Sequence, residues 1–267
     1  MFDVNADITF IKKQKSRPYY DSSAITGMVP KLYFKTENKK VLIRDIRKLK
    51  NYSLDKNGFE FYKKDFEFNS DDALNDYVNY KNQLKEFLKE IIDFKYIEIF
   101  DITKRSNRKT GAYNFDGPRQ PAERAHVDYT ETSGPKRAKQ ILKNKILEFK
   151  KRRIIQLNLW RPISRVVLSS PLAVADASTI KNNDLIATDQ IFPNRVGEIY
   201  HLAYNSAQDW YWVSEMRSNE LLIFKGWDNN NSEKVSRFTP HTSFNLESQD
   251  LDAFPRESVE ARIYLIL

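Results

Sequence analysis

The feature that most constrains the fold is a succession of short strand-like segments over the second half of the chain. Each is rich in apolar, aromatic or β-branched residues and is followed by turn-forming residues. The segments are RIIQLNLWRPI (153–163), RVVLSS (165–170), GEIYHLAYN (197–205), DWYWVSEM (209–216), ELLIFKGWD (220–228), HTSFNL (241–246) and ESVEARIYLIL (257–267). Short strands at such spacing are typical of a β barrel or jelly roll. We therefore expect a mainly β protein with flanking helices, in which residues 96–267 form a double-stranded β-helix.

The first 95 residues have a mixed α/β pattern and are expected to pack on this barrel within a single domain, 1–267. Residues 32–37 and 39–49 read as short strands, and 58–68 alternate apolar and polar residues. Residues 70–72, Ser-Asp-Asp, then favour a helix start. The apolar stripe of this helix, which extends to about Phe94, is Leu74, Tyr77, Val78, Leu84, Phe87, Leu88, Ile91 and Ile92.

The segment ERAHVDYT places a histidine two residues before an aspartate. The strand-like segment 95–105 precedes it, followed by an exposed loop at 106–123 that contains two glycines and two prolines. His126 is one of only three histidines in the chain. In a strand, His126 and Asp128 lie on the same face, and both side chains are metal ligands. The motif therefore predicts two ligands of a metal site.

A third ligand must come from elsewhere, and His241 at the start of segment 241–246 is the candidate. The chain has no cysteine, so a disulfide or thiolate site is excluded. Two histidines and a carboxylate on one face of an octahedron, with open positions, are the arrangement of non-haem Fe(II) oxygenases. The remaining histidine, His201, alternates with Ile199 and is expected to face outward or to pack beside aromatic residues, without binding the metal.

The last strand offers candidates for binding a co-substrate. Oxygenases of this type commonly bind the distal carboxylate of 2-oxoglutarate with an arginine, whose guanidinium pairs with it bidentately. Alternation puts Arg256, Ser258 and Arg262 on one face. We prefer Arg256, assisted by the Ser258 hydroxyl; Arg262, six residues further on, is the rival. Asn158, on segment 153–163, is expected to hydrogen-bond the co-substrate or the substrate.

The net charge of +8 is confined to one segment. Residues 136–153 contain nine Lys or Arg and one Glu, whereas the rest of the chain has 35 residues of each sign. Ala138, Ile141, Leu142, Ile146 and Phe149 recur at helical spacing, which predicts an amphipathic helix docked on the domain with a solvated basic face. The alternative is a docking face for an acidic partner, a carrier protein or a phosphate-bearing substrate.

The sequence contains a series of phrases that resemble the fungal and bacterial oxygenase group that includes the gibberellin desaturase, the AsaB-type hydroxylase or desaturase, and the cephamycin methoxylation protein. The shared phrases, which follow one another over almost the whole chain, are VLIRDIRKL, NGFEF, FDITKR, ERAHVDYT, LNLWRPI, SSPLAVADASTI, GEIYHLAYN, DWYWVSEMRSNELLIFKGWD, PHTSF and FPRESVEARIYLIL. The resemblance implies a cupin-like jelly roll that uses Fe(II), 2-oxoglutarate and O2 to hydroxylate or desaturate a small molecule of specialised metabolism. It assigns the ligands to His126, Asp128 and His241, and the co-substrate arginine to Arg256.

Two departures from the resembled group stand where a substrate is expected to touch. Tyr129 replaces a frequent glutamine after the aspartate, and KGWDNN, which contains Trp227, replaces a tyrosine-aspartate-serine run. Together with Tyr200, these are the candidate substrate contacts. The substrate itself and the choice between hydroxylation and desaturation do not follow from the sequence.

Two other classes of function remain as alternatives. A nucleic-acid-directed oxygenase is disfavoured, because the basic segment has no interleaved aromatic residues for base stacking. A metal barrel with a non-redox isomerase, lyase or accessory role is the second. No apolar run has the length of a bilayer span, and the amino terminus does not have the order of a secretory signal, so we expect a cytoplasmic protein with no membrane partner.

Overall fold

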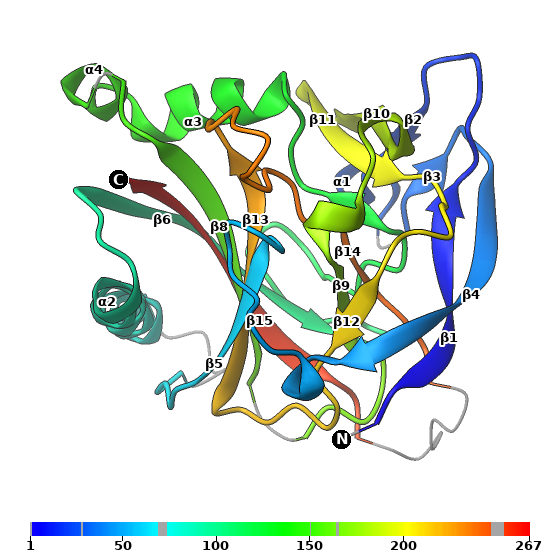
Figure 1. Cartoon of the computed structure of the whole chain (residues 1–267), viewed down its shortest axis with the longest axis horizontal. Helices are drawn as coiled ribbons and strands as arrows, with labels where there is room; N and C mark the ends of the chain where they lie inside the picture. Colours follow the sequence, from blue (N-terminus) through cyan, green and yellow to red (C-terminus); the bar gives the residue numbers. More distant parts are fainter. Residues whose placement is uncertain (1, 28, 69–73, 150, 164–165, 247–253) are drawn as a thin grey trace.

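The computed structural model describes residues 2–27, 29–68, 74–149, 151–163, 166–246 and 254–267. Two β-sheets form a barrel, with helices on its outside (Figure 1). In the described part of the chain, no helix is long and apolar enough to cross a membrane.

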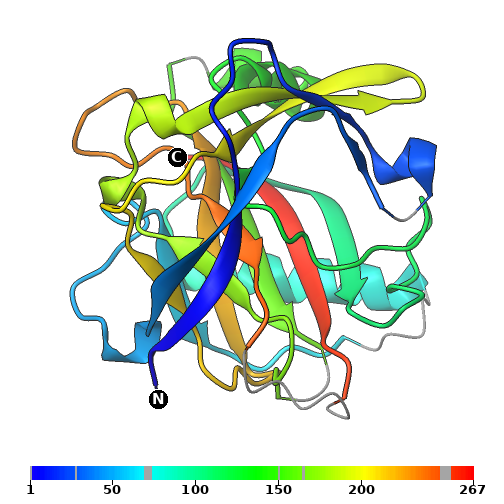
Figure 2. The ribbon, with the colours of Figure 1, turned by 90° about the vertical axis from the view of Figure 1, so that its right-hand side faces the viewer.

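The larger sheet has ten strands and contains three segments that later supply site residues. Its strands, in spatial order, are β1 (Val4–Ile11), β4 (Thr36–Asp45), β12 (Trp210–Trp212), β9 (Leu172–Ala175), β14 (His241–Ser243), β7 (His126–Val127), β11 (Arg195–Leu202), β10 (Leu185–Phe192), β2 (Tyr19–Asp21) and β3 (Lys31–Leu32). Pairing is antiparallel except between β4 and β12 and between β2 and β10. Figure 2 shows β1 and β4 running together along one side of the barrel.

The smaller sheet has five strands. In spatial order they are β5 (Phe59–Lys63), β13 (Glu220–Asp228), β8 (Ile154–Pro162), β15 (Glu257–Ile266) and β6 (Tyr96–Ser106). β5 and four strands of the larger sheet come from the first 95 residues. The amino-terminal part is therefore built into both sheets, whereas the sequence had suggested a part packed on the barrel.

Helices lie on the outside of the smaller sheet and at one end of the barrel (Figure 1). They are α1 (Ser23–Thr26), α2 (Leu74–Ile91), α3 (Ser133–Leu142) and α4 (Lys145–Glu148), with 3-10 turns η1 (Ile46–Lys48), η2 (Ala177–Thr179) and η3 (Asn182–Asp184). The predicted cap of α2 at residues 70–72 lies outside the described residues. Its apolar stripe contributes Leu84, Phe87 and Leu88 to the core, but Val78 is 53% exposed and does not belong to it.

Alternation along β8 and β15 separates a helix-covered core from the barrel interior. Leu157, Leu159, Ala261 and Ile263 pack in the cluster that includes the α2 residues. Their sequence neighbours point to the other side of the sheet. This side carries Asn158 of β8 and Arg262 of β15, which are cross-strand partners, whereas Arg161 of β8 faces α2 and bonds Tyr80. The barrel interior is therefore where the two predicted site segments meet.

Two predicted elements differ in the structure. Of the predicted strand 165–170, residue 165 lies outside the described residues and 166–170 form no strand. Ser170 takes a left-handed conformation (φ 45°) before Pro171, and β9 begins only at Leu172. The second half of segment 58–68 leaves the sheet to pack Phe66 and Phe68 against Tyr80 of α2. Strands β1, β2, β9 and β10 lie outside the segments that the sequence analysis marked as extended.

The basic segment 136–153 is not one helix. α3 begins at Ser133, and Lys143, with φ 48°, separates it from α4, which ends at Glu148. The predicted apolar face is nevertheless docked: Ala138 and Leu142 are buried, and Ile146 packs against the same cluster. The break changes the direction of the chain while keeping apolar residues on both sides against the barrel.

Candidate metal centre and its cavity

Three neighbouring strands of the larger sheet position the histidines. β7 is only two residues long and lies between β14 and β11. His126 is the cross-strand partner of both His241 on β14 and His201 on β11. Asp128 follows β7 in a bend. The predicted strand around His126 is thus present, but Asp128 lies just beyond its end.

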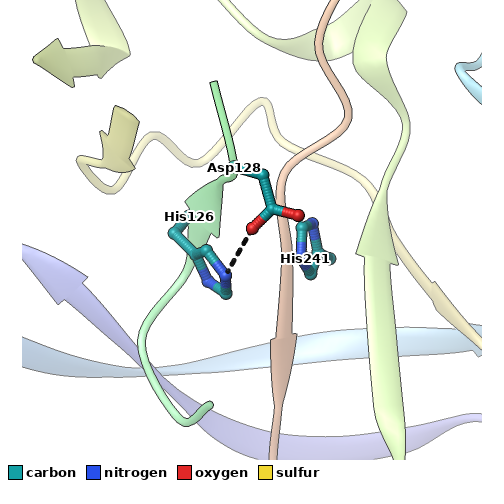
Figure 3. Close-up of side chains that lie close together, drawn as sticks. All are labelled: His126, Asp128 and His241. Atoms are coloured by element: carbon teal, nitrogen blue, oxygen red, sulfur yellow. Dashed lines mark ion pairs between the residues drawn. The ribbon is translucent and has the colours of Figure 1, made fainter. Parts of the chain in front are cut away.

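His126, Asp128 and His241 converge on one point (Figure 3). One potential ligand atom from each residue lies within 4.8 Å of the other two. The His126 Nε2 is 3.6 Å from the Asp128 Oδ1, and the two imidazole centroids are 4.4 Å apart. Separations of this size leave room for one ion bonded to all three groups. The structure therefore brings together the three residues that the sequence singled out.

Backbone carbonyls orient both imidazoles. The Nδ1 atom of His126 lies 2.8 Å from the Arg124 carbonyl oxygen, and that of His241 lies 3.1 Å from the Thr239 carbonyl oxygen. A neutral imidazole that donates from Nδ1 has its lone pair on Nε2. Burial, together with the neighbouring His126, lowers the pKa of His241 to about 3. The ring is thus neutral at physiological pH, as a metal ligand must be.

The Asp128 carboxylate is held through one of its oxygens. Its Oδ2 accepts hydrogen bonds from the Asn158 amide at 2.8 Å and from the Arg262 Nε at 3.1 Å. Gln156 in turn donates to the Asn158 side-chain oxygen at 2.7 Å. Asn158 was expected to contact a co-substrate or substrate; in the structure it supports the candidate ligand Asp128, and its other described partner is Gln156.

Arg262 is surrounded by acidic groups. Besides Asp128, its guanidinium forms ion pairs with Asp101, at 2.6 Å, and with Glu260, at 2.5 Å. Burial works against ionisation of Asp128, but the Arg262 charge and the neighbouring histidines hold the pKa of the Asp128 carboxyl well below its usual range. Arg262 is therefore occupied in keeping this carboxylate ionised and oriented.

A small cavity of about 20 Å³ opens beside the triad and contains Arg256. The Arg256 side chain is buried; its Nη1 donates to the Ser170 carbonyl oxygen at 2.6 Å, and its guanidinium lies 5.5 Å from the centroid of the Trp160 ring. Its Nε atom has no hydrogen-bond partner within the described ranges. A buried donor with spare hydrogen-bonding capacity is suited to an anionic ligand. The Ser258 hydroxyl, by contrast, contacts the Arg105 carbonyl oxygen at 3.5 Å.

A second cavity, of about 780 Å³, extends from the other side of the triad toward α3 and the β10–β11 hairpin. His126, Asp128 and Arg262 line its inner end. Its volume lies within the range of small-molecule sites. The triad thus stands between a small pocket with an arginine and a large pocket open to solvent.

The three predicted substrate contacts have different positions. Tyr129 lines the large cavity, and burial raises the pKa of its hydroxyl to about 12. Trp227 is instead buried under α3, against Gly134. Tyr200 packs on Phe238 outside the described lining of the cavity. Trp227 and Tyr200 therefore lie outside the described cavity lining, and a role for either in substrate binding stays a prediction.

His201 has the environment of a core residue. Its ring packs against Tyr20 and Phe34, with centroids 5.6 and 5.0 Å away. Burial, and then the charge of Arg124, lowers its pKa well below the usual range. Of the two positions expected for His201, the structure shows the one beside aromatic rings.

Several residues of the large cavity were not singled out by the sequence. Four of them are basic: Arg124, Lys136, Arg137 and Arg195. Asp101, Thr103 and Arg105, from the FDITKR phrase, also line the cavity wall. The only sequence signal for the first group was the basic segment, which includes Lys136 and Arg137. Arg124 and Arg195 carried no signal, because their relation to the triad depends on how β11 pairs with β7.

The donor set fits ferrous iron. Two imidazole nitrogens and one carboxylate oxygen converge on one point, and the two cavities border the same residues. This is the ligand type and open geometry that non-haem Fe(II) sites use. The Asn158 and Arg262 contacts supply the outer hydrogen bonds that ligand carboxylates generally have.

Comparisons with known proteins identify relatives of this chain. A family model described as "Oxidoreductase/YMDC permease-like domain" matches residues 8–266. The Fe(II)/2-oxoglutarate-dependent dioxygenase nvfI of Aspergillus novofumigatus is 30% identical over 163 residues, which cover 60% of this chain and 56% of that protein. The hydroxylase/desaturase efuI of Hormonema carpetanum is 24% identical over 258 residues, 88% of this chain and 86% of that protein.

A third relative belongs to the group that the sequence resembled. The hydroxylase/desaturase asaB of Aspergillus flavus is 32% identical over 121 residues, 40% of this chain and 52% of that protein. The matched segments thus span about half the length of nvfI and asaB. A solved structure of the iron and alpha-ketoglutarate-dependent endoperoxidase NvfI matches with a TM-score of 0.85 and 23% identity, covering 99% of this chain and 98% of that one. The resemblance and the jelly-roll prediction are confirmed.

Proposed function

The chain belongs to the oxidoreductase/YMDC permease-like family, and from this premise we propose that it is an Fe(II)- and 2-oxoglutarate-dependent dioxygenase that hydroxylates or desaturates a small molecule of specialised metabolism. The observation that carries the proposal is the convergence of His126, Asp128 and His241 within 4.8 Å, beside two cavities of unequal size. The relatives, which are named as an Fe(II)/2-oxoglutarate-dependent dioxygenase and as hydroxylases/desaturases, support it.

The residues divide into ligands, supports and a co-substrate anchor. His126, Asp128 and His241 bind the iron. Asn158 and Arg262 keep one oxygen of Asp128 hydrogen-bonded, so the other oxygen is directed to the metal. Arg256 binds the distal carboxylate of 2-oxoglutarate, because it lines the small cavity next to both histidines and has a buried donor to spare. Ser258 contacts Arg105 rather than this cavity, and we assign it no contact with the co-substrate.

Bound iron and 2-oxoglutarate supply the chemistry: with O2, oxidative decarboxylation to succinate and carbon dioxide generates an oxidant that removes hydrogen from the substrate. The protein contributes geometry. The large cavity presents one C–H bond of the substrate to the inner end that His126 and Asp128 line. The β8, β13 and β15 side chains behind the triad are buried and exclude water from that side.

Succinate formation from 2-oxoglutarate tests this function. Protein loaded with Fe(II) without oxygen, then exposed to O2 and 2-oxoglutarate, is expected to form succinate, slowly without substrate and faster with it. The His241→Ala variant is the matched control. A non-redox isomerase, lyase or accessory protein would bind metal yet form no succinate in either case, and that result would refute the proposal.

Location, domain extent and macromolecular partners are further proposals. We place the enzyme in the cytoplasm, and we treat residues 1–267 as one domain because strands from both its parts share both sheets. The exposed lysines of α3 and of the turn after it, Lys136, Lys139 and Lys143, offer a docking face for an acidic partner or carrier protein. Cell fractionation tests the location. Co-purification in low and high salt tests the docking face, since an electrostatic partner is lost as salt rises.

A further inference from the structure

The charges that line the large cavity are unbalanced. Seven cationic and five acidic side chains line it. All five acids already form ion pairs with arginines: Asp189 and Glu198 with Arg17, Asp116 with Arg119, and Asp101 and Asp128 with Arg262. Across the described ranges, the other five cations of the lining form no ion pair with a carboxylate; they are Arg105, Arg124, Lys136, Arg137 and Arg195. The excess positive charge is therefore a property of the cavity wall.

The co-substrate offsets the positive charge at the inner end of the cavity. Arg105 lines the small cavity together with Arg256, and 2-oxoglutarate carries two carboxylates. The cations nearer the cavity mouth are not matched in this way. Arg137 lies on α3 and Arg195 on β11, two elements that are in contact. We call these two residues the outer pair.

Aromatic rings fix the outer pair in place. The Arg137 guanidinium lies over Phe100, 5.6 Å from the ring centroid, and that of Arg195 lies over Phe192 at 3.7 Å. Stacking on a ring restrains the guanidinium and leaves its N–H edges available for an anion. Burial, and then the charge of Arg137, lowers the pKa of Arg195. Both guanidiniums line the same cavity, from two elements that are in contact, and an anion bound between them offsets their like charges.

We propose that the substrate is anionic and that Arg137 and Arg195 bind its anionic group, a carboxylate or a phosphate ester, while its oxidisable carbon lies toward the triad. The inference rests on the proposed function, since it assigns the substrate class of the same site. An anchor of this kind determines the carbon that is attacked, because a guanidinium pair fixes both the position and the direction of an anion.

The test measures binding of two matched probe pairs, decanoate with decanamide and 2-naphthoate with 2-naphthamide, by equilibrium dialysis. The protein is loaded with Fe(II) and 2-oxoglutarate without oxygen, so that the co-substrate site is filled. Variants R137Q and R195Q remove one charge each, and K139Q removes an exposed charge of the same helix that lies outside the cavity lining. Iron and 2-oxoglutarate binding are measured in every variant.

At least one acid is expected to bind about tenfold more tightly than its amide, and R137Q and R195Q are each expected to weaken acid binding by about tenfold, with amide binding unchanged. K139Q should bind like the unmodified protein. Equal affinity for acid and amide, no binding of either acid, or an equal loss in K139Q would each overturn the proposal. Normal iron and 2-oxoglutarate affinities in R137Q and R195Q show that the metal site is intact.

A parallel arm with 4′-phosphopantetheine distinguishes the two sources of the anion. If it competes with the acids and depends on the outer pair, a phosphate of a tethered arm fits the site as well as a free carboxylate; if it does not compete, the carboxylate of a free substrate is the ligand. The dialysis is repeated on metal-free protein. Failure of iron or 2-oxoglutarate to bind would refute the oxygenase function, and dependence of acid binding on Arg137 and Arg195 would still be measured.

Discussion

Two arginines near β15, Arg256 just before the strand and Arg262 within it, are in opposite situations. Arg262 forms ion pairs with three carboxylates, those of Asp101, Asp128 and Glu260. Arg256, six residues earlier, is buried with one carbonyl partner and a donor that no described residue satisfies. A guanidinium that the protein has already neutralised serves the structure and its ligands, whereas one left with spare donors is available to a molecule from outside. The contrast supports the proposal that Arg262 marks the metal end of the site and Arg256 the co-substrate end.

The largest expected effect is at the metal end. Asp128→Ala removes a ligand, so iron affinity should fall by more than the roughly 10- to 100-fold that losing an outer-shell contact costs. Competition with a chelator under anaerobic conditions measures it. Asp101→Ala is the matched control, because Asp101 also pairs with Arg262 but is not a candidate ligand; it should keep iron affinity within about tenfold. Similar losses in both variants would mean that Asp128 acts only through Arg262.

Removing the charge of Arg262 should lower the free energy of unfolding of the protein more than removing the charge of Arg256. Arg262→Gln leaves three carboxylates without their shared cation, which should lower the free energy of unfolding by about 3–5 kcal/mol. Arg256→Gln removes a buried charge that has no carboxylate ion pair among the described residues, and should change it by less than about 1 kcal/mol. Urea denaturation of the two metal-free variants measures both values. Equal losses would erase the distinction between the two arginines.

For 2-oxoglutarate affinity, Arg256 should matter more than Arg262. Arg256→Gln is expected to weaken 2-oxoglutarate binding by about 30- to 100-fold, since it removes a charge-assisted hydrogen-bonding partner, with iron affinity unchanged. Calorimetric titration of the anaerobic Fe(II) protein measures both quantities. Arg256→Lys, which keeps the charge but not the planar fork, should recover part of the loss. Normal 2-oxoglutarate binding by Arg256→Gln would transfer the role to Arg262.

The β15 contrast also shows how far the sequence leads. Alternation placed Arg256 and Arg262 on one face, and the spacing of His126 and Asp128 marked two candidate ligands. These follow from local geometry. Local geometry does not tell which partners meet a side chain across the barrel. Asn158 was expected at a bound molecule, yet it bonds Asp128, because β8 and the bend after β7 face each other only in the closed barrel.

Local geometry also could not predict the position of Trp227 or the presence of Arg137 in the cavity wall. Trp227 is on a strand beside the barrel interior, but α3 approaches so closely that Gly134 is needed where it contacts the indole ring. The sequence marked 136–153 as basic without indicating that Arg137 lines a cavity, since that position depends on the contact of α3 with β11. Periodicity predicts which face of an element is buried. It does not predict which element comes to lie opposite that face.

The smallest expected effect concerns two cross-strand histidines, one with and one without a hydrogen-bond partner for its Nδ1 atom. His126 has a carbonyl partner for its Nδ1 atom, whereas the buried Nδ1 of His201 has none among the described residues. Burial lowers the pKa of His201 well below its usual range, so the unfolded chain takes up a proton at His201 first as pH falls below about 6.5. The folded protein should therefore lose up to about 1.4 kcal/mol of stability per pH unit from this group.

The His201→Phe variant isolates this contribution. Its free energy of unfolding, measured without metal in urea at pH 7.5 and pH 5.5, should fall less on acidification than that of the unmodified protein, by about 1 kcal/mol. His241, whose pKa is also lowered, is present in both proteins and cancels in the difference. An identical pH dependence would mean that His201 is protonated within the fold, which would place a charge beside Tyr20 and Phe34 and return this histidine to the list of functional candidates.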